Sequence, residues 1–243
     1  LGFFSCIQKE NSSNNNKYKR NAVFFDIDTA ITYPKEVISL TVRNNSFDKF
    51  IINYDKFINL KFINLADLSY NKLAIIFECL SNLEKLDDLE ISDFDSCEIP
   101  NNIFKLKNLK VLDIQNEKKF NLPDSLSYCS NLEILVAYNY NTLPKELYKL
   151  KKLKSISLGW QIKSFPKELL EMPNIERISL HGEIEELPND IIKLKKLRCL
   201  NLALNPIADK ERNYFIKHKK YDKLQFLVEQ MPQCKLILEW TAK

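Results

Sequence analysis

Apolar side chains recur along most of the chain in the spacing L-x-x-L-x-L, which several copies extend with an asparagine and a further apolar residue. The copies begin 21 to 26 residues apart, at Val37, Ile63, Leu86, Leu109, Leu132, Leu153, Ile175 and Leu197. The longest spacing, 26 residues, separates the first copy from the second. The second copy comprises Ile63, Ala66, Leu68, Asn71 and Leu73. One unit of this length cannot bury its own apolar face, so we predict that eight units stack around one continuous core.

A second pattern marks the other half of the units. An apolar residue followed by proline occurs at Ile99-Pro100, Leu122-Pro123, Leu143-Pro144, Phe165-Pro166 and Leu187-Pro188. Apolar residues then recur three apart, which is typical of a short helical or 3₁₀ turn. Proline suits the first turn because its missing N–H would be unpaired there anyway. The expected fold is therefore α/β, a right-handed curved horseshoe with parallel strands on the concave face and short helical turns on the convex face.

The two open ends of such a core need caps. We expect an N-terminal cap over residues 21–36, with apolar residues before a turn at Pro34, then eight repeats over residues 37–207. A C-terminal cap should cover residues 208–243, with one or two amphipathic helices begun at Asp209, which is a suitable N-cap. Residues 235–240 have the apolar content of a strand that covers the sheet edge.

The repeats resemble the leucine-rich-repeat superfamily, and the caps narrow the resemblance. Residues 29–47 and 205–238 resemble the caps of bacterial leucine-rich-repeat proteins, notably the leptospiral group, although the first unit is stretched and the C-terminal cap is long. The resemblance implies a non-catalytic binding protein, commonly exported, whose concave face binds a host or envelope protein or a glycan. The alternative is an intracellular scaffold or regulatory protein that uses the same face. Neither the resemblance nor the pattern of residues indicates the oligomeric state.

Residues 1–20 have a different character. The opening LGFFSC resembles the end of a bacterial lipoprotein signal, in which Cys6 would carry the lipid and provide the protein's contact with a membrane. The polar stretch that follows is typical of a flexible tether. The alternative is a disordered tail with an incidental cysteine. Lipidation would place the protein at the outer membrane or cell surface, while the alternative leaves it secreted or cytoplasmic.

Composition argues against most catalytic classes. The chain has only three glycines, too few for a phosphate-binding loop, and its six cysteines form no C-x-x-C pair. The net charge of +4 is mild, and the convex lysines lack the interleaved aromatic residues that nucleic-acid binding favours. We therefore expect no enzyme, no cofactor, no metal and no nucleic-acid partner. Catalysis by Cys199 with His181 as its base is the alternative.

Two groups of outward-facing strand residues are candidates for ligand binding. The first group combines aromatic residues and glycines on three consecutive repeats: Tyr138, Gly159, Trp160, His181 and Gly182. Exposed aromatic residues are frequent hot spots, and glycines would let a ligand approach the backbone; packing of the rings on one another is the alternative. The second group, on repeats 2–4, comprises Asp67, Tyr70, Glu90, Asp93 and Asp113, together with Asp88. It would attract a basic partner or form a solvated acidic face, with Ca²⁺ a weaker alternative.

Overall fold

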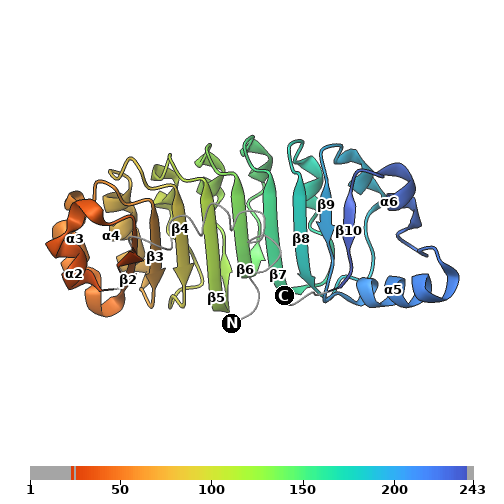
Figure 1. Ribbon diagram of the computed structural model, residues 1–243, viewed down its shortest axis with the longest axis horizontal. Coiled ribbons are helices and arrows are strands. Elements are labelled where there is room, and N and C mark those ends of the chain that lie inside the picture. The colour runs from red at the N-terminus through yellow and green to blue at the C-terminus, as the bar shows by residue number, and fades with distance from the viewer. Residues whose placement is uncertain (1–22, 25, 240–243) are drawn as a thin grey trace.

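The computed structural model describes residues 23–24 and 26–239, which form one ten-stranded sheet (Figure 1). All neighbouring strands are parallel and follow one another in chain order. The strands are β1 (Val23–Phe24), β2 (Ser39–Arg43), β3 (Phe62–Ala66), β4 (Asp88–Ser92), β5 (Val111–Asn121), β6 (Ile134–Thr142), β7 (Ser155–Ile162), β8 (Arg177–Gly182), β9 (Cys199–Asn201) and β10 (Lys235–Ile237). The expected solenoid of parallel strands is confirmed.

Helical turns connect successive strands across the opposite face. The first units carry α-helices and single 3₁₀ turns: α2 (Ile27–Thr32), η1 (Pro34–Glu36), η2 (Asn44–Ser46), α3 (Phe47–Asn53), η3 (Tyr54–Lys56) and α4 (Tyr70–Leu80). The later units carry only 3₁₀ turns: η4 (Asn101–Lys105), η5 (Asp124–Tyr128), η6 (Leu147–Lys149), η7 (Lys167–Glu171) and η8 (Asn189–Lys193). A proline precedes or opens most of these later turns, as its fixed φ favours.

The core runs the length of the molecule between the sheet and the turns. Each of the strands β2–β8 buries at least two apolar side chains, and each of the turns η4–η8 buries one more. The first inward row is almost completely buried and comprises Leu40, Ile63, Leu89, Leu112, Leu135, Ile156, Ile178 and Leu200. Truncation of one such leucine or isoleucine to alanine costs about 2–5 kcal/mol of folding free energy.

The strand register shows that the second repeat begins earlier than the sequence pattern predicted. Leu65 pairs with Val42 and with Ile91, so the unit begins at Leu60, three residues before the predicted start at Ile63. The long unit is therefore the second one, residues 60–85, because it contains α4, the longest helix before the C-terminal cap. As a result Asn64, and not Asp67, aligns with Thr41 on the outward face.

The C-terminal cap consists of α5 (Pro206–His218), α6 (Gln225–Gln230) and β10, the last strand of the sheet (Figure 1). The predicted N-cap Asp209 is wrong, because α5 begins three residues earlier and Asn205 stands at its N-cap. Asn205 is 1 % exposed, and its amide donates to the carbonyl oxygens of Leu180 (2.7 Å) and Leu202 (2.9 Å). It thus joins the cap to the seventh repeat.

An asparagine ladder, which the sequence pattern did not single out, runs along the edge where the strands begin. Each asparagine donates through Nδ2 to a main-chain oxygen of the preceding unit, at 2.7–3.0 Å: Asn59 to Lys35, Asn108 to Glu84, Asn131 to Lys107 and Asn174 to Lys151. Lysines of the next unit donate back to three of these amides: Lys85, Lys152 and Lys196. These bonds hold neighbouring units together where the convex turns lead into the sheet.

Candidate functional site

The sheet side of the solenoid presents two outward rows of side chains. The first row reads Thr41, Asn64, Glu90, Asp113, Val136, Ser157, Ser179 and Asn201. The second reads Arg43, Ala66, Ser92, Gln115, Tyr138, Gly159 and His181. Acidic residues therefore gather on β4 and β5, and an aromatic group lies on β6–β8.

Tyr138 lies flat across β7 and reaches His181 on β8. The two rings are stacked, with centroids 6.4 Å apart and planes inclined by 23°. The phenol oxygen of Tyr138 lies 3.1 Å from the Ser157 hydroxyl. A Cβ atom on Gly159 would lie 2.2 Å from Cδ1 of Tyr138, so the ring is in this position only because residue 159 is glycine. Gly159 therefore accommodates the tyrosine ring, and the expected direct approach of a ligand to its backbone is blocked.

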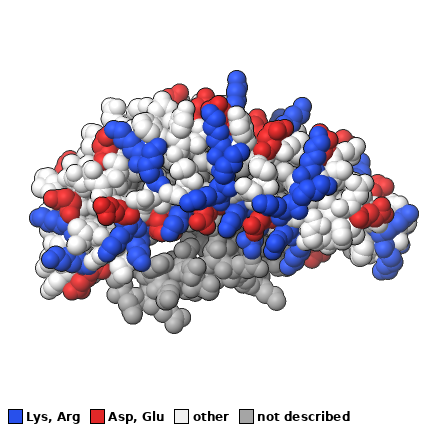
Figure 2. Space-filling view, turned by 90° about the horizontal axis from the view of Figure 1, so that it is seen from above, with Lys and Arg blue, Asp and Glu red and all other residues white. Residues whose placement is uncertain are grey.

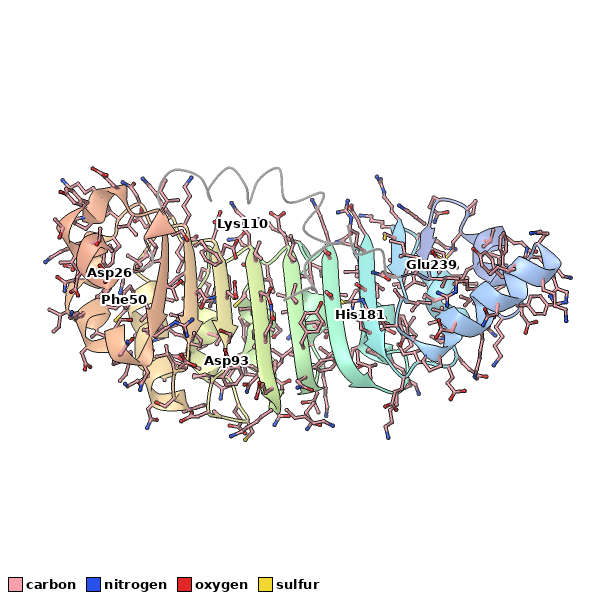
Figure 3. All side chains as sticks on the ribbon, turned by 60° about the horizontal axis from the view of Figure 1, so that its bottom comes forward. Asp26, Phe50, Asp93, Lys110, His181 and Glu239 are labelled. Atoms are coloured by element: carbon pink, nitrogen blue, oxygen red, sulfur yellow. The ribbon has the colours of Figure 1, made fainter. Side chains whose placement is uncertain are left out.

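His181 faces outward, as predicted, but only 7 % of it is exposed (Figure 3). Its Nε2 lies 3.4 Å from the Ser179 hydroxyl, and burial lowers the pKa of the imidazole below its usual value. The ring is therefore neutral at pH 7 and packs against the Tyr138 ring. Cys199 aligns with Arg177, four residues before His181 on β8, which is about 13 Å along the strand. The two side chains are too far apart to act as a nucleophile and its base.

Gly182 has a structural role of a different kind. A Cβ atom there would lie 2.5 Å from the main-chain oxygen of Ile162 and 2.8 Å from its nitrogen. Strand β7 bulges between Gly159 and Ile162, and pairing resumes between Ile162 and Gly182. Glycine thus permits close contact of two main chains. Trp160 belongs to this bulged part of β7, and its side chain lies outside the described residues.

Three carboxylates form what we call the acidic cluster: Asp88 and Glu90 on β4 and Asp113 on β5. Glu90 and Asp113 are register partners on adjacent strands, and Asp88 lies on the same face of β4 two residues earlier. Burial first, and then repulsion from neighbouring carboxylates, raises the pKa of Asp88 and of Asp113 to about 7. Gln115 donates to Asp113 (3.1 Å) and opposes this effect only in part. The cluster is therefore more than a solvated acidic face, because it holds protons near neutrality.

The remaining predicted acidic residues do not join this cluster. Asp67 and Asp93 stand at the turn after their strands, with left-handed backbones (φ 58° and 52°), and both are exposed (Figure 3 labels Asp93). Asp67 accepts a hydrogen bond from Arg43 at 2.8 Å. Tyr70 begins α4 and is not on the sheet, so its predicted place on the concave face is wrong. The register error in the second repeat explains the misplacement of Asp67 and Tyr70.

Sequence reasoning missed two members of the outward rows, Asn64 and Ala66. Asn64 lies between Thr41 and Glu90, and its side-chain oxygen is buried without a hydrogen-bond partner among the described residues. A correct register for the second repeat would have found it. An unpaired acceptor beside carboxylates adds to the acceptor character of this part of the face.

The convex side carries aromatic rings among its lysines, contrary to our expectation. Phe104, Tyr128 and Tyr148 lie on three consecutive turns, η4–η6, and each is at least 36 % exposed. The ammonium groups of Lys107, Lys149 and Lys151 lie 5.3–5.9 Å from the ring centroids. Lysines and arginines are spaced along the molecule with acidic side chains between them (Figure 2). On the convex turns, Lys105 pairs with Glu78 and Lys149 pairs with Glu146, so this side is of mixed charge, and its rings are already in contact with cations.

Metal and membrane features are limited in the described part of the chain. No group of three or more histidine, cysteine, aspartate or glutamate side chains is placed there to hold a metal ion. No helix among the described residues has the length and apolar character required to cross a bilayer. Cys6, the predicted lipidation site, and the tether over residues 1–20 lie outside the described residues.

The comparisons with known proteins agree with this architecture. The model of the leucine-rich repeat region matches residues 36–181, more than half of the chain, so the chain belongs to the leucine-rich-repeat family. The fold of this family typically serves protein interaction. Among curated proteins, none matches the chain in sequence.

Solved structures show the same fold at low identity. A leucine-rich-repeat protein of Leptospira interrogans is 22 % identical with a TM-score of 0.59; the match covers 75 % of this chain and 47 % of that one, so this chain spans about half of its length. An internalin of Listeria monocytogenes is 15 % identical with a TM-score of 0.56, over 88 % of this chain and 64 % of the other. The leucine-rich repeat domain of the type III effector XopL is also 15 % identical, with a TM-score of 0.53 and coverages of 96 % and 93 %.

Proposed function

We propose that this protein is a non-catalytic binding module that holds a protein partner against the sheet side over β4–β8. The observation that carries the proposal is the juxtaposition of two features on one face: the acidic cluster and the Tyr138–His181 pair. The first attracts basic side chains, and the second offers a flat, preformed packing surface. Together they favour a partner that presents lysine or arginine next to an apolar or aromatic side chain. A glycan is the alternative ligand for the same face.

Electrostatics supports a basic partner. Asp88 and Asp113 are kept partly protonated because burial and repulsion disfavour their ionised forms. A cation placed among the three carboxylates would relieve that repulsion, so binding and deprotonation would favour each other. Perturbed carboxyl groups of this kind are more frequent at functional sites than elsewhere on protein surfaces.

Affinity capture tests this proposal. The unaltered protein, the Glu90→Gln/Asp113→Asn variant and the matched control Glu84→Gln/Asp124→Asn, whose acidic residues are exposed outside the sheet, would each be cross-linked to their partners. Partners would then be quantified by mass spectrometry. We expect the first variant to lose on the order of tenfold of the specific partner, and the control to retain it. Equal recovery with all three proteins would contradict binding through the acidic cluster.

We further propose that the protein is exported and anchored through a lipid on Cys6. The resemblance of LGFFSC to the end of a lipoprotein signal supports this proposal. The match in fold to an internalin and to a type III effector domain agrees with it but is a likeness of fold. Mass spectrometry of the N-terminal peptide, combined with protease treatment of intact cells, tests it. A lipidated, surface-cleaved peptide directs the search to host or envelope partners, whereas an unmodified, protected one favours the intracellular scaffold.

A further inference from the structure

The last strand of the sheet has an open edge. Within the described residues, β10 is paired only with β9. The N–H of Lys235 donates to the Arg198 oxygen (2.8 Å), and the Ile237 oxygen accepts from Leu202 (2.9 Å). Because main-chain groups alternate in direction along a strand, those of Leu236 point away from β9, and we expect those of Leu238, which directly follows β10, to do the same. No described residue forms a hydrogen bond with them, so this edge is a template for another strand.

The open edge is apolar at its centre, although β10 is short and the charged residues Lys235 and Glu239 flank the apolar residues. Leu236, Ile237 and Leu238 are consecutive and partly exposed, with no proline, bulge or charge among them. A groove beside the strand is lined on its other side by Phe215 and Ile216 of α5, which are 40 % and 64 % exposed. Burial of these side chains against a partner would stabilise an association.

The residues of this edge are complementary to themselves. Residues 235–239 read Lys-Leu-Ile-Leu-Glu, with exposed opposite charges at the two ends (Figure 3 labels Glu239). If two copies are aligned antiparallel about Ile237, Lys235 of each copy faces Glu239 of the other, and Leu236 faces Leu238. We propose that β10 pairs with β10 of a second copy in this register, which joins two solenoids end to end in a two-fold symmetric dimer.

The direction of the main-chain groups agrees with this register. Leu236 and Leu238 direct both their N–H and C=O groups to the open edge, so each forms a hydrogen-bonded pair with its opposite residue, and the two pairs supply four bonds. Lys235 and Glu239 fall in non-hydrogen-bonded pairs, where opposite side chains approach most closely. A shift by two residues would place Lys235 opposite Ile237 in one direction, or Glu239 opposite Ile237 in the other, and would lose both ion pairs. Charge therefore selects one register.

Charge exchange at the two ends tests the dimer. The molar mass of the full chain would be measured by light scattering over a dilution series, for the unaltered protein, Lys235→Glu, Glu239→Lys and the double exchange. Either single change places like charges opposite each other at both ends and should weaken dimerisation by roughly tenfold or more. The double exchange restores two opposite-charge pairs and should restore the dimer. Lys220→Glu and Glu229→Lys make the same charge changes elsewhere in the cap and should leave the mass unchanged.

Three results would overturn the proposal. One is a wild-type monomer up to about 1 mM, where even a weak contact is populated. Another is a double exchange that stays monomeric although its circular dichroism matches that of the unaltered protein. The third is growth beyond the dimer, because an isologous contact about a two-fold axis closes on itself.

Discussion

At the scale of single residues, the absence of a side chain at Gly159 determines the position of the Tyr138 ring. A methyl group at residue 159 would overlap the ring, with a 2.2 Å approach to Cδ1. Gly159→Ala should therefore displace Tyr138 from His181 and cost about 1–3 kcal/mol of unfolding free energy, as overpacking does. Urea denaturation measures this effect. In a Tyr138→Ala background the same substitution should cost little, and equal costs in both backgrounds would show that the ring is not the obstacle.

The raised pKa values of the acidic cluster make stability depend on pH. Asp88 and Asp113 titrate near pH 7 in the folded protein, whereas their ordinary pKa is 3.8. Between these values the folded protein binds protons that the unfolded chain has released, so stability falls as pH rises through that window. Asp113→Asn removes one such group. We expect its urea midpoint to fall less than that of the unaltered protein between about pH 5 and about pH 8.

Asp124→Asn is the control for this measurement, because Asp124 is exposed and belongs to the turn η5, whereas the acidic cluster lies on the strands β4 and β5. It removes the same charge and should leave the slope of stability against pH as it is in the unaltered protein. A slope that Asp113→Asn does not reduce would mean that Asp113 is ionised throughout this range.

At the scale of elements, one asparagine connects the last repeat to its neighbours. Asn205 donates to Leu180 and Leu202 and accepts from the N–H of Ile184 (3.1 Å). Asn205→Ala removes the side-chain partner of the buried Ile184 N–H and of the Leu180 oxygen, while the Leu202 oxygen still accepts from the N–H of residue 205, and it should cost about 1–3 kcal/mol. Asn45, the equivalent residue of the first repeat, is exposed, and Asn45→Ala should change stability by less than about 0.5 kcal/mol. Thermal unfolding of both variants tests the contrast, and similar losses would contradict it.

The second repeat shows where sequence patterns fail at this scale. Ile63, Ala66, Leu68, Asn71 and Leu73 match the repeat template, including its asparagine, but the strand itself is Phe62–Ala66 and begins three residues earlier than the template implies. Helix α4 follows closely, and its apolar residues recur three and four apart, much as those of the repeat do. Two alignments therefore satisfy the same pattern. Only the hydrogen bonds to β2 and β4 distinguish them.

At the scale of the whole molecule, each unit contacts mainly the units next to it, so a local defect should remain local. Leu224 is fully buried in the C-terminal cap. Leu224→Ala should loosen that cap and raise hydrogen exchange in α5, β9 and β10, while β4 keeps its protection. Exchange measured by mass spectrometry tests this prediction, and Ile103→Ala in η4 is the control that should instead affect β4 and β5. A uniform increase along the chain for both variants would contradict nearest-neighbour coupling.

The sequence by itself determined the repeat fold and the positions of the five later convex turns, η4–η8. These features follow from apolar periodicity, which dictates which face of each unit must be buried. It also singled out Glu90, Asp113, Tyr138 and His181 as outward residues. The tertiary structure decided the register of the second repeat, the removal of Asp67 and Tyr70 from the binding face, and the roles of both strand glycines. These depend on which backbones and rings become neighbours across the sheet, and spacing along one chain does not contain that information.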